Sequence, residues 1–155
     1  MKLVFLMVGK TNEKYFNDAI LEYEKRIKRF IPFEIITIPD SKGIKSADVL
    51  KETEGELILK QVKSDDFLIL LDEKGKSFSS IKFASYVEKL LSRSDKRIIF
   101  AIGGAYGFSK GVYERADDKI SLSEMTFSHQ LVRVVFTEQL YRAFTIINNL
   151  PYHHE

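Results

Sequence analysis

The sequence contains no cysteine, and this absence removes several chemistries at once. Disulfide bonds, thiolate zinc sites and cysteine nucleophiles are all excluded. No stretch approaches the roughly 18 consecutive apolar residues that indicate a membrane-spanning helix. The apolar run within MKLVFLMVGK is too short for a secretory signal and lacks a small-residue cleavage site, so it favours a first strand. We therefore expect a cytoplasmic protein that does not associate with a membrane.

Several nucleotide-binding and hydrolytic motifs are also missing. No Gly-x-Ser-x-Gly segment is present to supply a hydrolase nucleophile. Neither the dinucleotide fingerprint G-x-G-x-x-G nor a P-loop ending in Gly-Lys-Ser/Thr occurs. A Rossmann-type nucleotide binder is consequently the weakest of the functions that we consider.

The chain also has little excess of either positive or negative charge. The 24 basic and 22 acidic residues leave a net charge of +2, which is too small to attract nucleic acid over the whole surface. Any contact with RNA must come from local patches, such as Lys25, Arg26, Lys28 and Arg29, although such a run is more often a solvated helix face. The length of 155 residues predicts a single domain that covers residues 1–155.

Strand and helix patterns alternate along the whole chain, without repeats or linkers. The runs FLILLD and RIIFAI are continuously apolar, as in strands that are covered on both faces. This order predicts an α/β fold, a single-domain, mostly parallel sheet with helices on both faces. The expected strands are Lys2–Val8, Phe33–Ile38, 67–72, Arg97–Ile102 and 119–122, and the expected helices begin near Thr11, Ser46, Ser79, Ser109 and Ser128, the last running over 129–148.

Ligands of such sheets bind beyond the carboxyl ends of the strands, so the segments after Leu71, Ile102 and Leu122 are candidate sites. The turn GGAYG, residues 103–107, follows a strong strand, and glycine allows close backbone approach to a ligand. A plain strand-to-helix turn explains it equally well. The segment LSEMTF, residues 122–127, mixes small, hydroxyl and apolar side chains that suit an adenine ring, with an ordinary connecting loop as the alternative.

The final helix carries the remaining polar candidates. His129 and Arg133 are spaced one helical turn apart, so together they would hold a phosphate or polarise a base. The alternative is that His129 is a surface residue of the first turn and that Arg142 only pairs with Glu138. Apolar residues cover most of this helix, which predicts burial on more than one side and a two-fold homodimer.

The tail PYHHE contains two adjacent histidines and a glutamate. Neighbouring histidines at a chain end rarely converge on one ion, and no further ligand set accompanies them. We therefore expect no metal site.

Taken together, the Gly-Gly-x-x-Gly turn after RIIFAI, the segment SLSEMTFSHQLVRVVFTEQLYRAF and the ending NNLPYHHE resemble the RlmH family of the SPOUT superfamily. The resemblance extends over the whole chain, including MKLVFLMVGK and PFEIITIP. It implies a C-terminal trefoil knot, a homodimer and S-adenosylmethionine as methyl donor. The implied acceptor is N3 of a pseudouridine in the 23S RNA of the assembled large subunit.

Residue roles follow from the same resemblance. The family commonly has proline or threonine at Ser128, and a basic residue at His154. Cofactor contacts are implied for Leu71, Gly103, Gly104, Leu122, Ser123, Glu124, Met125, Thr126 and Phe127, and substrate handling for His129, Arg133, Arg142, Tyr152 and His153.

Methyl transfer to a uracil-type N3 requires loss of the proton on that nitrogen. A neighbouring cation, Arg142 or Arg133, would lower the pKa of the base, and His129 or His153 would accept the proton. The sequence leaves both choices open. It also leaves open a SPOUT methyltransferase acting on transfer RNA and a non-catalytic ribosome-associated factor.

Overall fold

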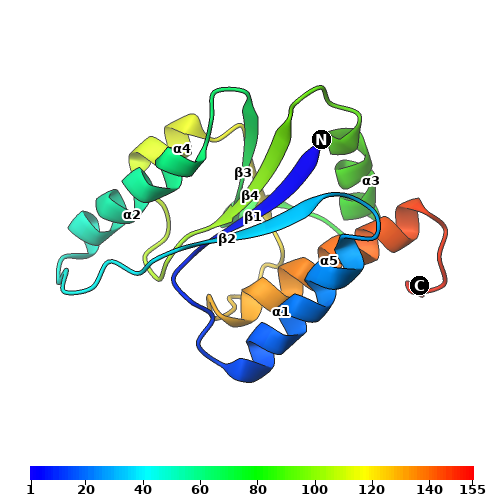
Figure 1. Cartoon of the computed structure of the whole chain (residues 1–155), viewed down its shortest axis with the longest axis horizontal. Coiled ribbons are helices and arrows are strands. Elements are labelled where there is room, and N and C mark those ends of the chain that lie inside the picture. Colours follow the sequence, from blue (N-terminus) through cyan, green and yellow to red (C-terminus); the bar gives the residue numbers. More distant parts are fainter.

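The computed structural model describes residues Met1 to Glu155. Five strands and five helices alternate along the chain (Figure 1). In order they are β1 (Lys2–Val8), α1 (Lys14–Ile27), β2 (Phe33–Ile38), α2 (Ala47–Gln61), β3 (Asp66–Ser77), α3 (Ser80–Leu91), β4 (Arg97–Ile102), α4 (Lys110–Arg115), β5 (Asp118–Ser121) and α5 (Leu131–Ile147).

The five strands form one sheet in the order β2-β1-β4-β3-β5, and every neighbouring pair is parallel. The first strand of the chain therefore lies inside the sheet, between β2 and β4. Parallel strands need crossover connections, and the helices provide them. The predicted α/β class and the predicted sheet are confirmed, with the sheet parallel throughout.

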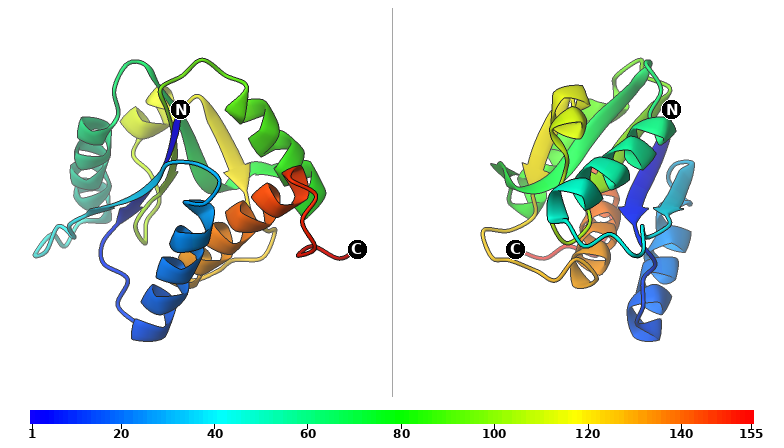
Figure 2. Two further views of the ribbon diagram at one scale, coloured as in Figure 1. Left: turned by 45° about the vertical axis from the view of Figure 1, so that its right-hand side comes forward. Right: turned by 90° about the vertical axis from the view of Figure 1, so that its left-hand side faces the viewer.

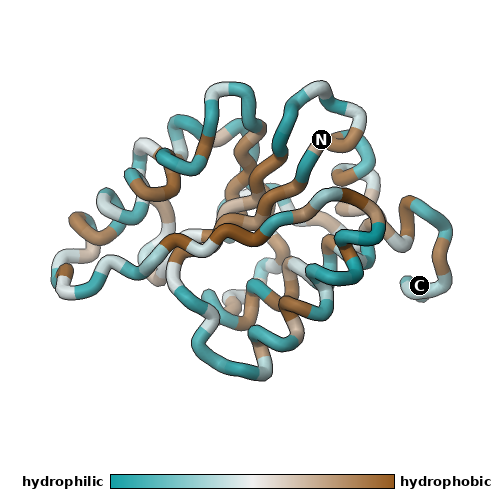
Figure 3. Tube along the Cα trace, viewed as in Figure 1, coloured by the Kyte–Doolittle hydropathy of each residue, from teal (hydrophilic) through white to brown (hydrophobic).

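Two hydrophobic cores lie on opposite faces of the sheet, because successive side chains of a strand alternate in direction. Along β1, Leu3, Phe5 and Met7 join one core, which also contains residues of α1, α3 and α5. Val4, Leu6 and Val8 face the other core, with residues of α2 and α4. The strands are accordingly the most apolar part of the chain (Figure 3), and helices cover both faces as predicted (Figure 2).

Serine caps define the start of three helices. Ser46, Ser79 and Ser109 precede α2, α3 and α4, and each hydroxyl accepts a hydrogen bond from the backbone N–H three residues later. Such a cap satisfies an otherwise unpaired amide and contributes about 1 kcal/mol. These three predicted helix starts are confirmed.

Other boundaries differ from prediction. The predicted cap at Thr11 is wrong, because α1 begins at Lys14 after Glu13, which makes no side-chain cap. The strand predicted over 67–72 continues to Ser77, with an irregularity in its pairing with β5. The helix predicted over 129–148 spans Leu131–Ile147, and the hydroxyl of Ser128 accepts from the backbone N–H of Leu131. No helix has the length and apolar composition needed to cross a membrane.

Candidate functional site

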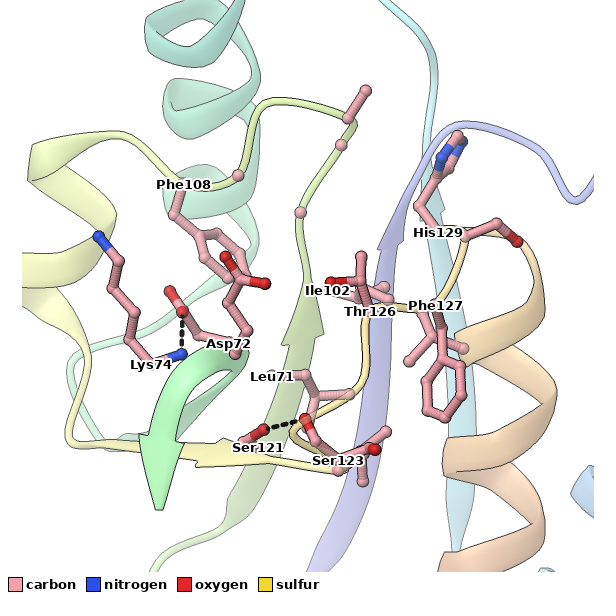
Figure 4. A pocket seen from close by; sticks show the side chains of 18 of the residues that line it. Leu71, Asp72, Lys74, Ile102, Phe108, Ser121, Ser123, Thr126, Phe127 and His129 are labelled. Atoms are coloured by element: carbon pink, nitrogen blue, oxygen red, sulfur yellow. Dashed lines mark hydrogen bonds between the residues drawn. The ribbon is translucent and has the colours of Figure 1, made fainter. Parts of the chain in front are cut away.

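A cavity of about 590 Å³ lies beside the middle of β3, at Leu71 to Lys74, and at the carboxyl ends of β4 and β5 (Figure 4). Its volume falls within the range of small-molecule sites. Leu71 of β3 and Ile102 of β4 form part of its wall, with segments 103–108 and 121–129 around them. The two loops that the sequence singled out therefore meet around one cavity.

The glycine turn forms one side of this cavity. The backbone N–H of Gly107 donates to the carbonyl of Gly104 at 3.1 Å, and Gly107 has a φ of +83°, a conformation that favours glycine. A Cβ atom on Gly103 would lie 3.1 Å from the carbonyl oxygen of Gly107. The tight turn therefore needs glycine at both of its ends.

The segment after β5 forms the opposite side. The hydroxyl of Ser121 donates to the carbonyl of Ser123 at 2.8 Å, and the hydroxyl of Ser123 accepts from the backbone N–H of Met125 at 2.9 Å. Met125 is 76% exposed. The residues predicted to contact a cofactor all line the cavity except Glu124, namely Leu71, Gly103, Gly104, Leu122, Ser123, Met125, Thr126 and Phe127.

Several residues of the wall were not predicted, and Asp72 and Tyr113 are two of them. Asp72 follows the buried part of β3, and its carboxylate accepts a hydrogen bond from the hydroxyl of Tyr113 on α4. Burial of the phenol, and to a lesser extent its hydrogen bond to Asp72, raise the pKa of Tyr113 to about 12. The phenol therefore stays protonated at neutral pH. The position of Asp72 after an apolar strand signalled its place at the sheet edge, whereas no sequence pattern singled out Tyr113.

His129 lines the cavity from the segment that leads into α5, as Figure 4 shows. Arg133 does not accompany it. Its side chain is fully buried and points into the protein, where it donates to the carbonyl oxygens of Val8 and Gly9 and to the hydroxyl of Thr11. The prediction that the imidazole and the guanidinium project together as a phosphate-binding pair is therefore wrong.

Arg133 instead fastens α5 to the exit of β1. Burial lowers the pKa of its guanidinium, and the charge of Asp40 opposes that shift. The side chain of Gln130 adds two contacts to the same region, accepting from the N–H of Asn12 at 2.8 Å and donating to the carbonyl of Lys10 at 3.1 Å. The loop that carries His129 is thus anchored to the start of the chain.

The other predicted substrate residues gather at the far end of α5. Arg142 pairs with Glu138, and its Nη1 lies 3.1 Å from Nδ1 of His153. The hydroxyl of Tyr152 donates to Glu138 at 3.1 Å, and the Arg142 guanidinium lies 4.8 Å from the centre of the Tyr152 ring. The sequence left the pairing of Arg142 with Glu138 open as an alternative, and the structure contains that pair. It grouped Arg142, Tyr152 and His153 by role but not by contact.

This polar cluster of Glu138, Arg142, Tyr152 and His153 is separate from the cavity within one chain. At about 1.5 Å per helical residue, Arg142 lies about 17 Å along α5 from Leu131, which is two residues after His129. The hydrogen bond that Arg142 donates to Glu138 raises the pKa of the guanidinium, so it stays charged. No group of three or more His, Asp or Glu side chains is placed to hold a metal ion.

Comparisons with known proteins extend over the whole chain. A family model described as predicted SPOUT methyltransferase matches residues 1–153. The chain is 54% identical to ribosomal RNA large subunit methyltransferase H of Parabacteroides distasonis, over 100% of both chains. It is also 54% identical to the protein of that name from Christiangramia forsetii, over 99% of each chain.

A solved structure supports the fold. The structure of a probable methylase family protein from Haemophilus influenzae Rd KW20 superimposes with a TM-score of 0.57. It covers 99% of this chain and 70% of that chain at 13% sequence identity, a likeness that concerns the fold alone.

Proposed function

This chain belongs to the RlmH family of SPOUT methyltransferases, and on that basis we propose that it methylates N3 of a pseudouridine in 23S ribosomal RNA. The methyl donor of SPOUT methyltransferases is S-adenosylmethionine. The relatives named above are large-subunit RNA methyltransferases, which favours ribosomal over transfer RNA as the acceptor. The observation that carries the proposal is the single cavity that the glycine turn and the segment 122–127 enclose.

The cavity fits the cofactor in size and in chemistry. Its volume of about 590 Å³ suits a ligand of adenosyl size, and its wall combines apolar side chains with exposed loop backbone. Phe127, Leu71 and Ile102 supply apolar surface for a ring, while backbone groups of the two loops supply hydrogen bonds to its edge. Bound there, S-adenosylmethionine would supply an electrophilic methyl group.

The residues of the chain must then present and deprotonate the acceptor base. His129 lines the cavity and is the first candidate to accept the N3 proton. Arg142 is a permanent cation beside His153, and a cation next to the base would lower the pKa of N3. Arg133 is fully buried, which favours a supporting role over direct contact with the base.

The distance between His129 and Arg142 along α5 favours a site that two chains share. We propose a homodimer in which the polar cluster of one chain approaches the cavity of its partner. Partly exposed apolar side chains of α5, among them Leu131 and Val134, provide surface for that interface. A two-fold arrangement produces two equivalent composite sites.

We further propose that the carboxyl-terminal part of the single domain, residues 1–155, is knotted. The segment after β5 starts at the outer edge of the sheet, yet α5 packs with α1 and α3 on one face. The connection must therefore pass the carboxyl ends of β3 and β4, beside the turn 103–107. A chain pulled from its termini would then extend to less than about 3.6 Å per residue, because a tightened knot retains part of the length.

We expect the protein to be cytoplasmic. Its function is tested by mass spectrometry of 23S RNA from cells with and without the protein. Loss of one N3-methylated pseudouridine in the absence of the protein is the expected result. Incorporation of labelled methyl groups should be high on assembled ribosomes and low on protein-free 23S RNA. Preferential labelling of transfer RNA would overturn the proposed acceptor.

A further inference from the structure

A buried carboxyl group lies behind the glycine turn, outside the cavity itself. Glu54, on α2, is only 7% exposed, and it is not part of the cavity wall. Its carboxylate packs against Gly104: a Cβ atom on that glycine would lie 2.9 Å from Oε1, closer still to Oε2, and 3.0 Å from the carboxyl carbon. The turn is therefore in direct contact with a charged side chain of another element.

The contact between α2 and this part of the chain has two points. Gly55, the neighbour of Glu54, faces Ser109. A Cβ atom added to Gly55 would lie only 2.9 Å from the Cβ atom of Ser109. The glycine of each segment thus makes room for a polar side chain of the other. This mutual close approach fixes α2 against residues 104–109.

The requirement for glycine at position 104 follows from Glu54 and not from the backbone. The glycines with positive φ are Gly9, Gly43 and Gly107, and Gly104 is not among them. An alanine would be tolerated by the local backbone, but its methyl group would collide with the carboxylate. Gly104 and Glu54 should consequently be coupled when both are mutated.

The carboxyl group is costly to keep in this place. Burial is the main cause that raises the pKa of Glu54, and the negative charge of Asp40 raises it further. A backbone hydrogen bond from Gly104 acts in the opposite direction and lowers the pKa. No cation compensates the buried charge. A carboxyl group without a cationic partner contributes little to stability, which favours a functional reason for its presence.

We propose that Glu54 is a positioning residue for the cofactor, holding Gly104 so that the turn 103–107 keeps the shape that S-adenosylmethionine requires. It acts through the turn and does not touch the reacting atoms. This inference rests on the proposed function, because it assumes that the cavity binds that cofactor.

The first test measures S-adenosylmethionine binding by calorimetry for Glu54→Ala and Glu54→Gln. Loss of the polar contact should weaken binding about tenfold in Glu54→Ala. The amide oxygen of Glu54→Gln still accepts from the turn and should restore affinity to within about threefold of the wild type. The control is Glu56→Ala, since Glu56 lies exposed on the same helix and its loss should not change affinity.

The second test combines Glu54→Ala with Gly104→Ala. Each single variant should bind the cofactor weakly, whereas the double variant should be no worse than either one, because the methyl group occupies the space of the lost carboxyl. Strictly additive losses would contradict the proposal. Thermal unfolding of every variant separates a binding effect from a general loss of stability, and Gly104→Ala perturbs the same contact should Glu54→Ala not fold.

A third measurement needs no cofactor. Amide hydrogen exchange at residues 104–107 of the free protein should be faster in Glu54→Ala than in the wild type or in Glu56→Ala. If the wild type bound no S-adenosylmethionine, the proposed function would fail, while the exchange result would still report on the contact. If the wild type bound and Glu54→Ala had equal affinity and equal exchange, the positioning role alone would be refuted.

Discussion

The guanidinium of Arg133 donates a hydrogen bond to the carbonyl oxygen of Val8 at 2.8 Å, joining residues 125 positions apart in the chain. Further bonds from the same group reach Gly9 at 2.9 Å and the hydroxyl of Thr11 at 3.0 Å. Arg133, Val8 and Gly9 are all buried, so water is a poor alternative partner for these two carbonyl oxygens. Arg133 therefore belongs to the scaffold of the site.

Replacing this arginine should destabilise the fold. Arg133→Met keeps apolar bulk but leaves buried carbonyl oxygens unpaired, and each such group costs about 1–3 kcal/mol. We expect a loss of about 3 kcal/mol in the free energy of unfolding, measured with urea. Arg29→Met, at an exposed arginine, serves as the control and should change stability little. A stable Arg133→Met variant without activity would instead indicate a direct catalytic role.

Acid sensitivity should depend on Asp66. Burial raises the pKa of this carboxyl, but Arg97 at 2.6 Å and the backbone of Lys63 outweigh burial, so the net shift is downward. A lowered pKa in the folded state means that the pair stabilises the protein above the unfolded pKa of Asp66 and loses this effect as pH falls through the folded pKa.

The corresponding experiment compares urea unfolding of the wild type and Asp66→Asn between pH 7 and pH 3. The variant should be less stable at neutral pH by about 3 kcal/mol, because Arg97 loses its partner. The difference should shrink as the pH falls. A constant difference over the whole range would show that the charge of Asp66 does not matter.

Gly107→Ala should weaken cofactor binding. Gly107 has a positive φ and free space around it, so an added methyl group strains the backbone without a collision. The left-handed conformation costs about 1–2 kcal/mol for other residues, which corresponds to roughly tenfold if the turn shifts to relieve it. Gly43→Ala is the matched control, with a φ of +81°, free space and no place in the cavity wall. If Gly107→Ala and Gly43→Ala bound the cofactor with equal affinity, the conformation of the turn would not contribute to binding.

A shared site can be tested with mixed dimers. His129→Ala and Arg142→Ala homodimers should both be nearly inactive on ribosomes. In a mixed dimer, one composite site contains both substitutions and the other contains neither. Random mixing should therefore restore about a quarter of wild-type activity, since about half of the dimers are mixed. No recovery after mixing would place both residues in the site of a single chain.

Sequence reasoning identified the strands well where local pattern and burial coincide. The bounds of Lys2–Val8, Phe33–Ile38 and Arg97–Ile102 are confirmed, because each of these mainly apolar runs is followed by glycine or proline. The extension of β3 to Ser77 was missed, since its residues are polar and their strand conformation depends on pairing with β5.

The candidate site was predicted in its two loops but not in its supporting contacts. Arginine is rarely buried, so an arginine on a helix gives no local signal that it points inward. Arg133 was therefore grouped with His129 as a residue that would contact the substrate. Glu54 was overlooked for a similar reason: its contact with Gly104 joins residues 50 positions apart, and only the crossing of α2 over the turn brings them together.

The attachment of α5 to the exit of β1 has a consequence for biosynthesis. Residues near position 130 must contact residues 8–12 before the loop that carries His129 has a fixed place. A growing polypeptide that still lacks this helix has an unfinished binding pocket. The binding pocket is therefore completed only after all five strands of the sheet have been synthesised.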